Sequence, residues 1–150
     1  MNVIRKSELA KDNLYMKMFV HFMRVGNIIN RKVEILLKAF EITLVQFNIL
    51  RILEVEHPEV MSVGEIKQQL FFPAPDVTRL LDRLEKRKLV KRKICPKNRR
   101  KIDVSITPSG LELVNSIIPI FNEKFNGYYA DVITGDERDL LIDVFKRIKE

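Results

Sequence analysis

Apolar residues recur at helical spacing near both ends of the chain. Between residues 9 and 39, side chains such as Met16, Phe19 and Met23 return every three or four positions, which predicts a long helix with one apolar stripe. A last helix is predicted after Thr134, with acidic residues leading and basic residues trailing, as the helix dipole prefers. The side chains expected to face inward on this last helix are Leu140, Leu141, Val144, Phe145 and Ile148.

The middle of the chain contains two copies of a helix-start pattern. Thr43 is followed three residues later by Gln46, and Ser62 is followed in the same way by Glu65, which is the spacing of a capping box. The first copy predicts a second helix that ends before Pro58, because proline disfavours helical geometry in the residue before it. The second copy predicts a short third helix.

A break at residues 71–75 separates this third helix from a fourth. Pro75 suits the first turn of the fourth helix, and Asp76 lies near its positive end. Two short helices joined by a tight break predict a helix-turn-helix. The expected buried face of the fourth helix consists of Val77, Leu80, Leu81 and Leu84.

After residue 88 the hydrophobic period changes from helical to two. Residues 101–106 alternate polar and apolar, residues 89–94 are the expected partner strand, and the linker 95–100 contains turn-forming residues. Thr107 and Pro108 then start another helix. The fold class predicted is mainly α with a small β-hairpin wing, a winged helix-turn-helix flanked by long dimerisation helices.

The positive charge of the chain is concentrated in one segment. The chain has a net charge of +7, and residues 83–101 contain eleven basic residues against one acid, Glu85, so the rest of the chain has a slight excess of acids. Such a patch is typical of a surface that binds a polyanion, although a solvated charged face has the same composition. Its position at the end of the fourth helix and on the hairpin favours DNA binding.

Motifs of catalysis and export are not found in the sequence. It has no glycine-rich phosphate loop, nucleophile elbow or metal-ligand spacing, so we expect neither an enzyme nor a metal or cofactor. The single cysteine, Cys95, lies near two lysines that would favour its thiolate, but a lone cysteine is more often inert. Without a signal peptide or an apolar span, the protein is expected to be cytoplasmic and to have no membrane partner.

Several segments together resemble the MarR family of bacterial transcription regulators. The similarity lies in residues 43–50, 76–87, 89–92, 98–100 and 106–110, and these segments are spread from residue 43 to residue 110. The resemblance implies a homodimer on a pseudo-palindromic double-stranded DNA operator, with recognition helices in successive major grooves and wings in the minor groove. It also implies a division into an N-terminal dimerisation helix (1–40), a DNA-binding region (41–107) and C-terminal dimerisation helices (108–150) within one intertwined domain.

The candidate DNA-binding residues lie on the fourth helix and at the hairpin tip. Arg79 and Arg83 are four residues apart, off the apolar stripe, and so can point outward together; the alternative for Arg79 is an intrahelical pair with Asp76 or Asp82. Asp76 could accept a hydrogen bond from cytosine or only stabilise the helix. The full set of candidates is Ala74, Asp76, Thr78, Arg79, Arg83, Lys97, Asn98, Arg99 and Arg100.

Two positions depart from the family pattern. Lys88 stands where the family usually has glycine, and a left-handed lysine would cost about 1–2 kcal/mol, which leaves the exit from the fourth helix open. Asn98 stands where an aspartate is usual, which leaves the geometry of the wing open.

The resemblance implies a repressor that a small aromatic or phenolic effector releases from DNA. The alternative is a winged-helix protein-interaction module without an effector response. The sequence names neither the operator, the regulated genes nor the effector.

Overall fold

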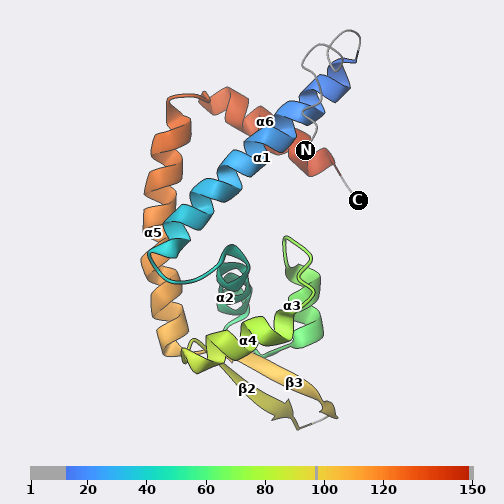
Figure 1. The fold of residues 1–150 in the computed structure, drawn as a ribbon, viewed down its shortest axis with the longest axis vertical. Helices are drawn as coiled ribbons and strands as arrows, with labels where there is room; N and C mark the ends of the chain where they lie inside the picture. Colours follow the sequence, from blue (N-terminus) through green and yellow to red (C-terminus); the bar gives the residue numbers. More distant parts are fainter. Residues whose placement is uncertain (1–12, 97, 149–150) are drawn as a thin grey trace, which may run out of the picture. The chain divides into compact units, whose positions relative to one another are not determined.

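The computed structural model describes residues 13–96 and 98–148. The chain forms two units, Met1–Phe47 and Asn48–Glu150, and each is described by itself. The mainly α fold with a small hairpin is confirmed (Figure 1). The elements are α1 (Leu14–Lys38), α2 (Leu44–Glu56), β1 (Met61–Ser62), α3 (Val63–Gln69), α4 (Val77–Lys86), β2 (Val90–Cys95), β3 (Asn98–Ile106), α5 (Pro108–Ala130) and α6 (Gly135–Arg147).

The first helix is bounded by local hydrogen bonds. The side chain of Asn13 accepts a hydrogen bond from the backbone N–H of Met16 at 3.2 Å and caps α1. The expected start of this helix, at residues 9–12, lies outside the described residues. At the other end Glu41 has a φ of 55°, and this left-handed residue turns the chain out of α1.

Both capping boxes expected in the middle of the chain are confirmed, and the predicted helix start after Thr134 has a third. In each one the hydroxyl group of the first residue accepts a hydrogen bond from a backbone N–H three residues later, and the side chain at that later position accepts one from the backbone N–H of the first. They join Thr43 to Gln46 at the start of α2, Ser62 to Glu65 at the start of α3, and Thr134 to Glu137 at the start of α6.

A three-stranded antiparallel sheet has the strand order β1-β3-β2. Ile94 pairs with Ile102, but the next residue, Cys95, pairs with Asn98, so an irregularity of the register absorbs extra residues of β3. The expected six-residue linker at 95–100 is therefore wrong, because β3 begins at Asn98 and the strands continue almost to the tip.

Buried side chains from α2, α3, α4, the sheet and the start of α5 form the core of the second unit. The buried Asn48 of α2 accepts a hydrogen bond from the backbone N–H of Phe71 at 3.0 Å, which ties the break between α3 and α4 to this core. The break therefore has a fixed anchor, as a helix-turn-helix requires. Fully buried core residues include Leu50, Leu53, Ile66, Leu81, Leu84, Val104, Val114 and Ile117.

The expected inward face of α6 is not buried within the chain. Leu140, Leu141, Phe145 and Ile148 are exposed and Val144 is half-buried. The prediction of an inward face was wrong for the single chain, because helical periodicity shows that a helix has an apolar face but not which element covers it. Among the described helices, none is long and apolar enough to cross a membrane.

Candidate nucleic-acid interface

The recognition helix of the predicted helix-turn-helix is α4, and Asp76 fixes where it begins. Asp76 is the N-cap, and its Oδ1 accepts a hydrogen bond from the backbone N–H of Arg79 at 3.4 Å. The expectation that Pro75 lies in the first turn is wrong, because the capping aspartate makes Val77 the first helical residue. Ala74, just before the cap, is half-buried.

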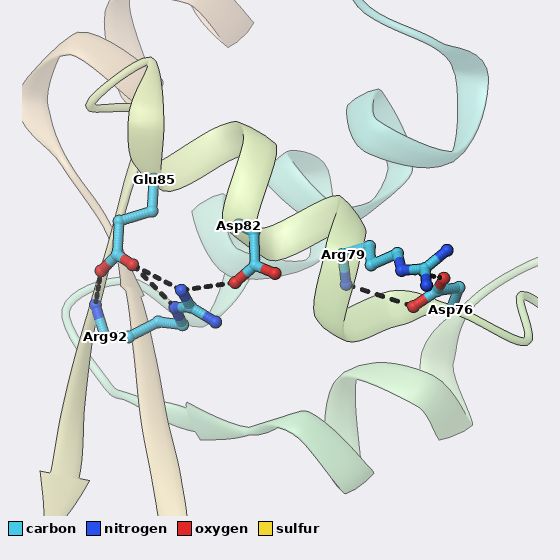
Figure 2. Close-up of polar contacts among 5 residues, drawn as sticks. All are labelled: Asp76, Arg79, Asp82, Glu85 and Arg92. Carbon is cyan, nitrogen blue, oxygen red and sulfur yellow. Dashed lines mark hydrogen bonds and ion pairs between the residues drawn. The ribbon is translucent and has the colours of Figure 1, made fainter.

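One face of α4 is buried and the other is open. Val77, Leu81 and Leu84 are fully buried, whereas Thr78, Arg79 and Arg83 are exposed. The side chain of Arg79 is 79% exposed, and its Nε lies 3.1 Å from Oδ2 of Asp76. The intrahelical pair considered for Arg79 is therefore formed, at the helix end shown in Figure 2.

The wing brings three more candidates to the surface. Asn98, Arg99 and Arg100 are exposed at the start of β3, and Lys97 lies outside the described residues. The side-chain oxygen of Asn98 accepts a hydrogen bond from the backbone N–H of Arg100 at 3.1 Å. An amide oxygen thus organises the wing tip at the position where the family usually has a carboxylate.

The wing tip and the recognition helix share one open groove. Thr78 of α4 lines this groove together with Arg100 and Lys101 of β3 and Ser62 at the start of α3, and its volume is about 430 Å³. The structure therefore brings together candidates from the helix and from the wing, while their contact with DNA remains a prediction.

The exit from α4 keeps a left-handed turn despite the lysine. Lys88 has a φ of 60°, its backbone N–H donates to the carbonyl of Glu85 at 2.8 Å, and the N–H of Leu89 donates to the carbonyl of Leu84 at 3.0 Å. These two bonds form a Schellman ending, in which glycine is usual at the left-handed position. Lys88 therefore adopts the left-handed backbone conformation that glycine usually supplies at this position, despite its conformational free-energy cost.

The same exit is tied to the start of α5. The hydroxyl of Thr107 donates to the carbonyl of Lys88 at 2.6 Å, and its backbone N–H donates to the carbonyl of Leu89 at 3.1 Å. A Cβ at Gly110 would lie 2.2 Å from that carbonyl oxygen of Leu89, so only glycine allows α5 to approach this closely.

Sequence reasoning missed the role of Arg92, which it counted only as part of the basic segment. Arg92 of β2 reaches α4 and contacts both Asp82 and Glu85 (Figure 2). The hydrogen bond from the Arg92 guanidinium lowers the pKa of Glu85, and the same bond is the main cause that raises the pKa of Arg92. The available signal was the strand period, which places Arg92 on the same face as the buried Val90.

Outside this surface, the described residues offer few candidates for a metal site or a reactive thiol. Among the described residues, no group of three or more histidine, cysteine, aspartate or glutamate side chains could hold a metal ion. Cys95 is a free, half-buried thiol at the end of β2. Neither observation adds a second site to the surface formed by α4 and the wing.

Comparisons with known proteins agree with this geometry. A family model described as MarR family matches residues 40–101, which span α2, the helix-turn-helix and most of the wing. The structure of a MarR transcription factor from Planctomyces limnophilus is 33% identical, with a TM-score of 0.69, and the match covers 92% of this chain and 99% of the other.

Two more distant relatives extend the comparison. The transcriptional regulator SarZ of Staphylococcus haemolyticus is 25% identical over 112 residues, which are 75% of this chain and 73% of the relative. The structure of the MepR–DNA complex of S. aureus is 22% identical with a TM-score of 0.73, covers 91% and 96% of the two chains, and shows a shared fold. From the fold, the family model and the P. limnophilus relative, the chain belongs to the MarR family of transcriptional regulators.

Proposed function

We propose that this protein is a homodimeric, sequence-specific DNA-binding repressor that a small effector releases from its operator. The observation that carries DNA binding is the shared groove of α4 and the wing, where Thr78 and Arg100 lie together. Arg79 and Arg83 on the outward face of α4, with Arg99 on the wing, supply exposed positive charge beside it. Binding to a DNA duplex uses a helix that contacts base edges and a neighbouring basic segment that contacts the phosphate backbone of DNA, and α4 and the wing have this arrangement.

Exposed apolar side chains support the homodimer. In the first unit, Met16, Phe19 and Met23 of α1 are between 42% and 54% exposed. In the second unit, Leu140 and Phe145 of α6 are 61% and 48% exposed. Monomeric proteins rarely expose large apolar surfaces, so we assign both faces to contacts with a second copy of the chain.

Salt dependence of binding to a random duplex tests the interface. If each subunit neutralises about four phosphates, the logarithm of affinity falls against the logarithm of salt concentration with a slope of about −7 for the dimer. A slope shallower than about −2 would show that the basic surface is not the contact, and would favour a protein-interaction module instead.

Sedimentation velocity without DNA tests the assembly. A dimer at micromolar concentration is expected. A monomer at that concentration would refute the assignment of the apolar faces of α1 and α6 to contacts with a second copy of the chain. The measurement needs no operator and so is independent of the salt titration.

The proposal that an effector releases the DNA rests on family membership and not on a cavity in the structure. Genomic fragments selected by the protein would supply the operator, and phenolic acids would then be added to the complex. Release of the operator by one of them, with the protein still dimeric and folded, supports the repressor model. If none releases it, a DNA-binding regulator without this effector response is the better description.

A further inference from the structure

Arg92 joins the wing to the recognition helix through two carboxylates. Its Nε and Nη2 donate to Oε2 of Glu85 at 2.8 and 2.7 Å, and Nη2 also lies 2.6 Å from Oδ1 of Asp82. The backbone N–H of Arg92 donates to Oε1 of Glu85 at 3.0 Å. Side chain and backbone of one wing residue are thus both bound to α4, as Figure 2 shows.

The cluster uses both acidic residues that lie within α4. Asp82 and Glu85 are three residues apart, so they project from the same side of the helix and a single guanidinium can bridge them. The planar guanidinium donates in several fixed directions, whereas a lysine ammonium is a point charge on a flexible stem. Replacing Arg92 with lysine would therefore keep the charge but lose the geometry.

Arg92 is directed toward the helix and away from solvent. Its side chain is 21% exposed, and strand alternation places it on the face of β2 that contains the buried Val90. Next to it, Lys93 lies on the opposite face and is exposed. Two neighbouring cations of the basic segment therefore have different surroundings.

We propose that Arg92 is a positioning residue, which fixes the wing against the recognition helix and thereby determines how well the protein distinguishes its operator from other DNA. The inference rests on the proposed DNA-binding function. Strand β2 is at the edge of the sheet, and only three residues join it to α4. A bridge at this point sets the orientation of the hairpin relative to the helix that reads the bases.

The test compares Arg92→Met with Lys93→Met, a matched loss of one positive charge from the same strand. Both variants and the wild type are titrated with the selected operator and with a scrambled duplex at several salt concentrations. For Arg92→Met we expect the wild-type salt slope, with an operator-to-scrambled affinity ratio that falls by about tenfold, the size of one good base contact. For Lys93→Met we expect the reverse, an unchanged ratio and a slope shallower by up to about 2 for the dimer.

Further variants keep the proposal falsifiable. Arg92→Lys should not restore the ratio, and Asp82→Asn, which leaves the Glu85 pair in place, should lower it less and serves if Arg92→Met does not fold. A shallower slope with an unchanged ratio in Arg92→Met would make Arg92 a phosphate contact. An unchanged ratio and slope with only a lower melting temperature would make it a purely structural residue; either result overturns the proposal.

A result without DNA separates this inference from the proposed function. Amide hydrogen exchange in β2 is expected to accelerate in Arg92→Met and to stay unchanged in Lys93→Met. If the wild type bound no DNA but this difference appeared, the DNA-binding function would fail while the bridge itself was confirmed. If the wild type bound DNA but exchange in β2 did not respond to Arg92→Met, the bridge would not fix the wing.

Discussion

Lys88 holds a backbone conformation that glycine would adopt without strain, and replacing it should stabilise the protein. Its φ is 60°, where a residue with a Cβ pays about 1–2 kcal/mol. Lys88→Gly removes this cost but gives the unfolded chain more freedom, worth about 0.4–1 kcal/mol. The balance is a stabilisation of about 0.5–1 kcal/mol from the backbone.

The matched control is Lys88→Ala, which keeps the left-handed strain. Both substitutions remove the positive charge that follows the C-terminal end of α4, so a loss of charge at this end of the helix dipole affects them equally. The difference between the glycine and alanine variants therefore isolates the backbone term. We expect the glycine variant to be the more stable one.

Urea unfolding followed by circular dichroism gives the difference in free energy of unfolding. The protein concentration must be the same for each variant, because the stability of a dimer depends on it. A glycine variant no more stable than the alanine variant would refute the claim that the turn at residue 88 is strained. A glycine variant that also lost operator binding would show that Lys88 has a role beyond its conformation.

Three other substitutions test the interface and its support. Arg79→Ala should reduce the difference in binding free energy between operator and scrambled DNA by about 1–3 kcal/mol, because a bidentate arginine discriminates guanine from other bases by that amount. An unchanged ratio of operator affinity to scrambled-duplex affinity in the same titration would contradict this. Arg99→Ala with Arg100→Ala should weaken both duplexes and make the salt slope shallower by about 2–4, whereas a wild-type slope would exclude phosphate contacts there. Gly110→Ala should destabilise the protein by about 1–3 kcal/mol in urea unfolding, because its Cβ would overlap the backbone. Gly64→Ala, whose Cβ has ordinary space, is its control and should not destabilise; equal effects would refute the packing argument.

Features that depend on neighbours in the sequence could be predicted. The capping boxes, the helix-turn-helix and the hairpin follow from side chains three residues apart or from alternation, and the structure confirms them. The start of α4 was placed too early because both Pro75 and Asp76 are favourable near a helix start, and only the hydrogen bond to Arg79 decides between them. The start of β3 at Asn98 was missed because the register irregularity at Cys95 has no signal in the alternation.

Features that depend on distant contacts could not be predicted in the same way. The apolar face of α6 is visible in the sequence, but what covers it is not, so its exposure in the chain was unexpected. Arg92 looked like any other cation of the basic segment, because its partners Asp82 and Glu85 belong to a different element. Charge counting gives the sign of a surface but not which charges face solvent.

Arg79 and Arg92 show why the surroundings of a charged side chain matter for the proposed function. The Nε of Arg79 lies 3.1 Å from Oδ2 of Asp76, in a pair whose arginine side chain is 79% exposed. In the proposed complex we expect the exposed guanidinium of Arg79 to donate to O6 and N7 of guanine while Asp76 holds it in place. Arg92 donates Nε and Nη2 to carboxylates, and its side chain is only 21% exposed. Arg79 at the start of α4 is therefore exposed and available for the proposed base contact. Arg92 is instead bound to Asp82 and Glu85 near the end of α4, where we propose that it fixes the wing.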